Sequence, residues 1–177
     1  MNRKWILRGG IFTLVIIVGA FLAHGSSSCV IKSTRAIVNG DSLQGDIENG
    51  SEVTVKNGYY KCNEVRRGDF VAYSMYGRKW PLVKVIRAIP GDTFSIVKNS
   101  NDLFQIIVAG EALRNASGEL YALDDSHAKV LMLAERTNKG VVPAGTYIML
   151  GDIVSGSLDS TKLGLIPMSK LIGKVVH

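Results

Sequence analysis

A run of uncharged residues near the N-terminus most constrains what this chain can fold into. Residues 9–28 contain no Asp, Glu, Lys or Arg, and as a helix these 20 residues would span about 30 Å, the thickness of a bilayer's hydrocarbon core. Arg3, Lys4 and Arg8 precede the run, and basic residues favour the cytoplasmic side of a membrane. We therefore predict a single-pass anchor in the cell membrane over residues 1–28 and an extracytoplasmic domain over residues 29–177.

A cleaved secretory peptide is the alternative interpretation of this segment. Ala23-His24-Gly25 contains the small residues of a cleavage site, whereas the three serines at 26–28 extend the run with small residues and favour a retained anchor. Both interpretations export the domain. An exported location permits a disulfide between Cys29 and Cys62, although free thiols are equally compatible with the sequence.

The charge balance argues against nucleic acid as a partner. The chain has a formal net charge of +6, but three of its basic residues precede the apolar run, which leaves 18 basic and 15 acidic side chains in the rest of the chain. No basic run interleaved with aromatic residues occurs. The partner that the sequence itself indicates is the lipid bilayer.

The residues after the apolar run have the pattern of β-strands. Apolar and polar residues alternate at 52–56 with the period of a half-buried strand, and clusters of Gly, Asn and Asp separate further short apolar stretches. We predict a mainly β domain, whereas residues 128–134 fit either a short helix or another strand. The predicted strands are 52–56, 70–73, 82–89, 93–97, 104–108, 145–150 and 172–176.

Several kinds of active site are not supported by the sequence. The histidines, His24, His127 and His177, lack the context of a Ser-His-Asp triad, and adjacent residues such as Asp124 and Asp125 point apart in a strand or turn. No phosphate loop or dinucleotide motif occurs, and two distant cysteines are too few for a zinc site. We predict neither a metal nor a cofactor.

A serine and a lysine remain as the candidate catalytic pair. Ser42 lies in a turn rich in Gly and Asp, where a serine is ordinarily only a turn residue. Lys84 lies within an apolar strand, where it either extends to water from an edge or is buried with a lowered pKa. A neutral lysine amine can activate a serine hydroxyl, and Ser157, in a later serine-rich turn, could orient that amine.

Four short motifs follow one another along the domain. They are Ser42-Leu43 with Gly50-x-x-Val53, then residues 65–71, 84–92 and 151–167; a terminal strand at 172–175 follows the last of them. This ordered set, with the anchor before it, resembles the type I signal peptidases, the membrane-bound Ser/Lys peptidases. The resemblance covers essentially the whole chain. It implies an antiparallel β domain that acts as a serine endopeptidase and removes signal peptides from exported preproteins.

The resemblance also implies a role for each matching residue. Ser42 is the nucleophile, Lys84 the general base and Ser157 the hydroxyl that orients the lysine. The backbone N–H of Ser42 forms part of the oxyanion hole, and Gly40 stands where some members carry a serine hydroxyl as the second donor, so its contribution would come from the backbone. Substrates are expected to carry small residues at the first and third positions before the cut.

Asp159 and Ser160 match structural residues beside the site. Thr161 stands where an arginine normally pairs with the aspartate, so we expect Asp159 to find another partner, for example Lys162, and to point away from Lys84. Two further departures are Gln44-Gly45 in place of a proline after the serine motif, and Ile153-Val154 in place of an asparagine-arginine pair.

Two other functions are compatible with the same residues. The middle region, residues 106–118, and the compact size resemble the conjugative-transfer peptidases of the same clan, which process pilin or related precursors. An inactive, membrane-tethered relative that binds exported peptides is the alternative from another class. The anchor argues against the cytoplasmic self-cleaving repressors that share Ser/Lys chemistry.

Overall fold

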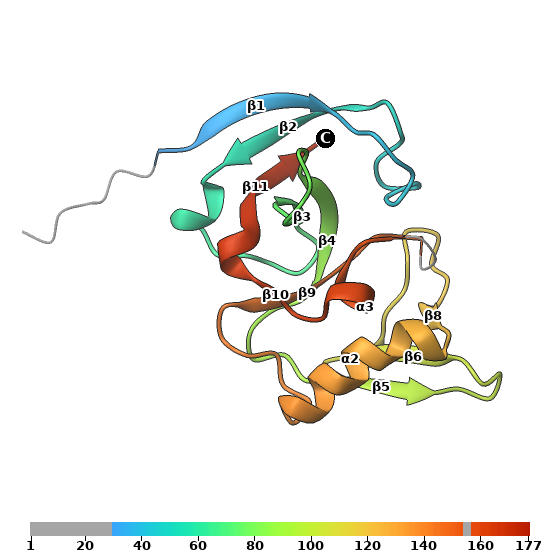
Figure 1. Cartoon of the computed structure of the whole chain (residues 1–177). Helices are drawn as coiled ribbons and strands as arrows, with labels where there is room; N and C mark the ends of the chain where they lie inside the picture. The colour runs from blue at the N-terminus through green and yellow to red at the C-terminus, as the bar shows by residue number, and fades with distance from the viewer. Residues whose placement is uncertain (1–29, 154–156) are drawn as a thin grey trace, which may run out of the picture.

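The computed structural model describes residues 30–153 and 157–177 (Figure 1). In these parts of the chain the strands form two antiparallel sheets, a larger one in the order β1-β2-β11-β3-β4-β9-β10 and a smaller one in the order β5-β6-β7 with β8 beside β6. The predicted mainly β fold is confirmed. The strands are β1 Lys32–Ile37, β2 Glu52–Asn57, β3 Phe70–Tyr73, β4 Leu82–Ala88, β5 Phe94–Lys98, β6 Phe104–Val108, β7 Glu111–Ala112, β8 Ala122–Leu123, β9 Thr146–Leu150, β10 Ile166–Pro167 and β11 Leu171–Val176.

All seven predicted strands are present, each within one residue of its predicted ends. The strands that sequence reasoning missed carry little periodic signal. All six residues of β1 are exposed, so this strand lacks the alternation of buried apolar and exposed polar residues from which a strand is predicted. β7, β8 and β10 have two residues each, which is too short for a pattern to be read.

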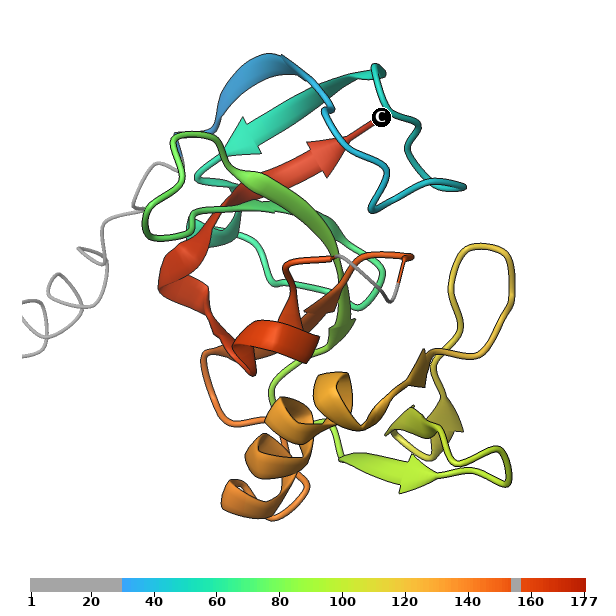
Figure 2. The ribbon, with the colours of Figure 1, turned by 45° about the vertical axis from the view of Figure 1, so that its right-hand side comes forward.

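The ambiguous stretch 128–134 lies within a helix, α2 (Asp125–Thr137), which packs against β5 and against the short helix α3 (Ser160–Leu163). The Asp124 side chain caps α2 by accepting a hydrogen bond from the N–H of His127 (2.9 Å). Ala128 and Leu131 are buried three residues apart, which is the spacing of one helix face. Figure 2 shows α2 and the smaller sheet together below the larger sheet.

One of the apolar clusters holds the Ser42 turn against the larger sheet. Leu43 and Ile47, on the turn between β1 and β2, are buried with Val53, Val85 and Val175 of β2, β4 and β11. Burial of Leu43 and Ile47 holds the turn, and Ser42 with it, against the sheet to which the strand of Lys84 belongs. Two short 3₁₀ helices, η1 (Tyr59–Lys61) and η2 (Met168–Lys170), complete the described secondary structure.

The predicted anchor, residues 1–28, lies outside the described residues. Within 30–153 and 157–177, no helix is long and apolar enough to cross a membrane. Cys62 is disulfide-bonded, so it is not the free thiol that the sequence left open. The chain's other cysteine, Cys29, is also outside the described residues.

Candidate active site

The turn at 38–51 presents Ser42 through local hydrogen bonds. The N–H of Val38 donates to Ser51 O and the N–H of Gly50 donates to Val38 O (both 2.9 Å), which closes the connection between β1 and β2. Gly40 has a φ of +124°, a backbone conformation that favours glycine, and its N–H donates to Asn49 Oδ1 (3.2 Å). Gly40 N–H is therefore engaged in the turn, whereas no hydrogen bond between described residues uses the N–H of Ser42.

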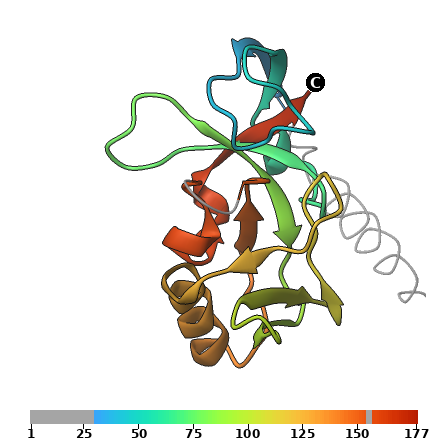
Figure 3. The same ribbon diagram turned by 90° about the vertical axis from the view of Figure 1, so that its right-hand side faces the viewer.

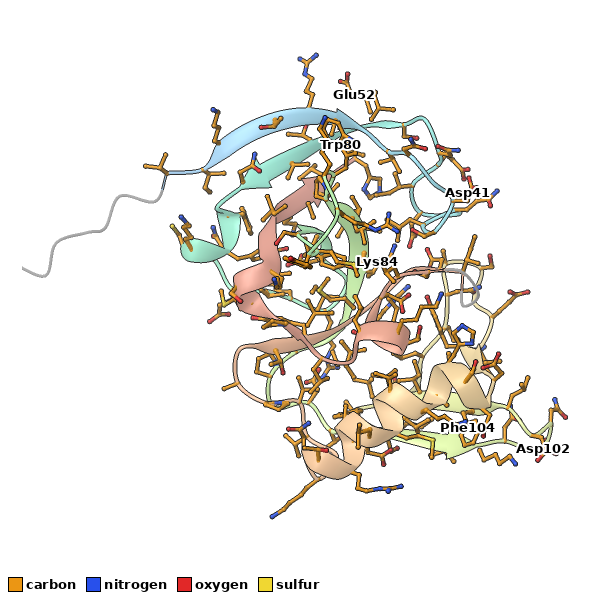
Figure 4. The ribbon with its side chains drawn as sticks, in the orientation of Figure 1. Asp41, Glu52, Trp80, Lys84, Asp102 and Phe104 are labelled. Carbon is orange, nitrogen blue, oxygen red and sulfur yellow. The ribbon has the colours of Figure 1, made fainter. Side chains whose placement is uncertain are left out.

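Lys84 projects from the interior of the larger sheet towards this turn. Its strand, β4, lies between β3 and β9, and the side chain of Lys84 is 2% exposed, so the alternative of a lysine extending from an edge strand is wrong. Lys84 Nζ donates to Ser42 Oγ at 2.6 Å and to the carbonyl oxygen of Val83 at 2.9 Å. Figure 4 shows Lys84 in the middle of the molecule, below the turn that carries Asp41.

Burial lowers the pKa of Lys84 from its ordinary value, because an ammonium loses its hydration in this position. The charges of Asp159 and, to a smaller extent, Asp152 act in the opposite direction. The lowering of the Lys84 pKa by burial is larger than the raising by these charges, because neither carboxylate forms an ion pair with the amine.

Asp159 forms neither a hydrogen bond nor an ion pair with Lys84, and its carboxylate is held by other residues. Its carboxylate accepts hydrogen bonds from Gly151 N–H (3.0 Å), Thr161 N–H (2.9 Å) and the Thr161 hydroxyl (2.8 Å). The expected ion pair with Lys162 is not formed: Lys162 is exposed, and Thr161 supplies the partner atoms instead. Ser160 is also engaged, since its Oγ accepts from Met149 N–H (2.9 Å).

Ser157 is buried beside the serine but does not bond to the lysine in this structure. A Cβ placed on Gly151 would lie 2.6 Å from Ser42 O and 2.7 Å from Ser157 Oγ, so both groups border the same glycine. Ser157 Oγ has no hydrogen-bond partner among the described residues. Besides Ser42 Oγ, the hydrogen-bond partner of Lys84 Nζ among the described residues is the Val83 carbonyl oxygen.

Sequence reasoning missed an ion pair that connects the serine turn to the lysine strand. The N–H of Asp152 donates to Ser42 O (2.6 Å), and Asp152 Oδ1 lies 3.0 Å from Arg87 Nη2 on β4. The N–H of Ala116 donates to the same carboxylate (3.2 Å). Burial and the neighbouring Asp46 raise the pKa of Asp152, against the effect of Arg87. Arg87 is a charged residue within an apolar strand, and this was the sequence signal that could have indicated a buried ion pair.

Replacing Lys84 by methionine tests whether burial lowers its pKa. A base whose pKa is lower in the folded than in the unfolded chain makes folding release a proton, so stability rises with pH between the lowered pKa and the ordinary value of 10.5. We expect Lys84→Met to be more stable than the wild type near neutral pH, and this advantage to shrink as pH rises through that window, by at most about 1.4 kcal/mol per pH unit. Thermal unfolding at several pH values measures it. A difference that does not vary with pH would show that Lys84 titrates alike in both states.

Comparison with known proteins places this chain in a family. The chain matches the family described as "Signal peptidase, peptidase S26" over residues 5–177. It is 28% identical over 156 residues to the signal peptidase I of Bacillus caldolyticus, covering 83% of this chain and 82% of that protein. It is 27% identical over 182 residues to the signal peptidase IB of Staphylococcus aureus (strain COL), covering 97% and 86% respectively.

Among solved structures, the chain is similar to a signal peptidase I from Enterococcus faecalis V583, with 20% sequence identity and a TM-score of 0.42. That similarity covers 63% of this chain and 97% of the other. The family match spans nearly the whole sequence, including all four motifs and both residues of the Ser42–Lys84 contact. The chain therefore belongs to the signal peptidase family, peptidase S26.

Proposed function

We propose that this signal peptidase is held in the membrane by residues 1–28 and cleaves exported preproteins with Ser42 as nucleophile and Lys84 as general base. The reaction itself, removal of signal peptides by a serine endopeptidase, follows from the family. The observation that carries the residue roles is the 2.6 Å contact between Lys84 Nζ and Ser42 Oγ in a buried position. Two further observations fit export: the disulfide at Cys62 and the basic residues before the apolar run.

The geometry supports a two-step acyl transfer. The neutral amine of Lys84 accepts the hydroxyl proton as Ser42 Oγ attacks the scissile carbonyl carbon, and the N–H of Ser42 is available to stabilise the oxyanion. The resulting ammonium gives its proton to the departing amine, which leaves an ester on Ser42. Lys84 then takes a proton from water as the water oxygen attacks the ester, and it returns that proton to Ser42 Oγ when the ester bond breaks. The signal peptide leaves with a free carboxyl terminus, and the serine hydroxyl and the neutral amine are restored.

The small residues expected before the cut provide the experiment that tests this function. In an extended substrate the first and third residues before the cut project to one side and the second to the other. We expect purified full-length protein to cleave a model preprotein with alanine at the first and third positions. Phenylalanine at either position should abolish cleavage, because a pocket for a small side chain cannot hold it.

Phenylalanine at the second position is the matched control and should leave cleavage nearly unchanged. The readout is separation of precursor from product on a gel, with the cut site confirmed by mass spectrometry. Efficient cleavage with phenylalanine immediately before the cut would contradict the proposed substrate class. Loss of all cleavage, the alanine substrate included, would contradict the peptidase function itself.

A further inference from the structure

Tyr73, the last residue of β3, connects two parts of the chain that are distant in sequence. Its side chain is 1% exposed, and its hydroxyl donates a hydrogen bond to the carbonyl oxygen of Leu158 at 2.5 Å. The two residues are 85 positions apart, and Leu158 directly follows Ser157. The hydrogen bond therefore ties the segment that carries Ser157 to the core of the larger sheet.

Tyr73 and Lys84 project from the same face of this sheet. In the pairing of β3 with β4, Val71 lies opposite Lys84 and Tyr73 lies opposite Leu82. Opposite residues of antiparallel strands share a face, as do residues two positions apart on one strand, so Lys84 is the diagonal neighbour of Tyr73. An aromatic side chain spans such a diagonal separation. β3 is also paired with β11, in red in Figure 3, so the strand that carries Tyr73 lies inside the sheet.

The segment that Tyr73 holds carries two residues of the site. Asp159 follows Leu158, and its carboxylate accepts a hydrogen bond from Gly151 N–H at 3.0 Å. Ser157 precedes Leu158 and is 3% exposed, and its Oγ has no hydrogen-bond partner within the described residues. The Ser157 side chain therefore does not fix its own position there. The hydrogen bonds of the two residues that follow it, Leu158 and Asp159, hold this segment.

The Tyr73 hydroxyl remains a donor at neutral and moderately alkaline pH. Burial and, to a smaller extent, the charge of Asp159 raise the pKa of Tyr73 above its ordinary value of 10.0. The hydroxyl keeps its proton below that value, so its hydrogen bond to Leu158 does not depend on pH in this range.

Lys84 has one N–H for which Ser157 is the available acceptor. In the neutral amine the lone pair accepts the Ser42 proton, and one N–H donates to Val83 O at 2.9 Å. The second N–H requires an acceptor, because a buried donor without a partner is unfavourable. Within the described residues Ser157 Oγ is a buried acceptor that no other group uses. Whether it meets the amine depends on how its segment is held.

We propose that Tyr73 is a positioning residue whose hydroxyl holds Leu158 so that Ser157 Oγ faces the Lys84 amine during proton transfer from Ser42. This inference rests on the proposed function of Ser42 and Lys84. Tyr73 touches neither the substrate nor the reacting atoms, and it acts through Ser157. It gives the lysine and the serine hydroxyl a common support, since its backbone is paired with β4 and its hydroxyl holds the residue after Ser157.

Tyr73→Phe tests this role because it removes the hydroxyl and keeps the buried ring. With full-length protein and the model preprotein that carries alanine, we expect kcat to fall about tenfold, the effect of losing one oriented hydrogen bond, with KM unchanged. In a Ser157→Ala background the same substitution should change kcat by at most about twofold, because the hydroxyl through which Tyr73 acts is already absent. Steady-state kinetics of the wild type, the two single variants and the double variant measure this dependence.

Tyr60→Phe is the matched control, because it also removes a buried tyrosine hydroxyl. Tyr60 is 6% exposed, and its hydroxyl donates to Asp69 Oδ2 at 3.1 Å rather than to a segment of the site. Thermal unfolding should show similar losses of stability in both tyrosine variants, whereas only Tyr73→Phe should lose kcat.

Several results would overturn the positioning role. They are a wild-type kcat in Tyr73→Phe, full activity in Ser157→Ala, an equal loss in Tyr60→Phe, or an equal effect of Tyr73→Phe with and without the Ser157 hydroxyl. The last two results would show a role in stability alone. Failure of the wild type to cleave the preprotein would instead contradict the proposed function.

Discussion

Lys84→Arg should abolish preprotein cleavage as completely as Lys84→Ala, with a fall in kcat/KM of about 10⁴-fold or more. A guanidinium cannot be deprotonated in a protein, so it cannot accept the Ser42 proton although it keeps the positive charge. The lysine that these variants remove is 2% exposed and lies 2.6 Å from Ser42 Oγ. Lys56→Arg, the same change on β2 away from the contact, should leave kcat/KM unchanged.

Combining the two substitutions tests whether the residues act as one unit. Ser42→Ala alone should remove nearly all activity, and Ser42→Ala/Lys84→Ala should be little worse than either single variant. A bulky guanidinium can disturb a buried site, so Lys84→Met provides a second variant with a side chain of similar length. Thermal unfolding of each variant checks that it is folded. Cleavage by folded Lys84→Arg within tenfold of the wild type would refute the general-base role.

Gly151→Ala should reduce kcat by about 100-fold, although the substitution adds one methyl group and no charge. The added Cβ would lie 2.6 Å from Ser42 O and 2.7 Å from Ser157 Oγ, and real Cβ atoms essentially never approach within 3.0 Å. Ser42 must therefore shift relative to Gly151, and a displacement of about 1 Å at a reacting group costs about this factor in rate. Overpacking of this kind also lowers the free energy of unfolding by about 1–3 kcal/mol.

Gly118→Ala is the control for this prediction. A Cβ at Gly118 meets open space, and its cost is limited to the strain of its φ of +81°, about 1–2 kcal/mol. We expect its kcat to equal that of the wild type. Steady-state kinetics and thermal unfolding of both variants measure the effects. Full activity in Gly151→Ala would show that the Ser42 turn tolerates displacement, and the contact with Lys84 would then not depend on this close packing.

Seven of the domain's strands were determined by local sequence. Alternating apolar residues and Gly-rich turns predicted them, because burying one face of a strand requires that alternation. The helix α2 was left ambiguous because a short apolar run fits either element, and β1 was missed because no residue of it is buried. The order of the strands depends on pairings between distant residues, such as β11 between β2 and β3, which no local pattern contains.

For the site, too, the sequence and the tertiary structure supplied different information: the sequence indicated residues, and the fold showed their partners. The sequence by itself indicated Ser42 and Lys84 as a candidate pair, because both stand in ordered motifs that resemble those of the type I signal peptidases, whereas a serine on a turn or a lysine in an apolar strand alone indicates little. Only the tertiary structure decided their partners: Val83 O as the second acceptor of Lys84, Thr161 as the partner of Asp159, and Asp152 with Arg87 beside Ser42. Hydrogen bonds of buried groups depend on which atoms packing leaves within about 3 Å, and packing is a property of the whole fold.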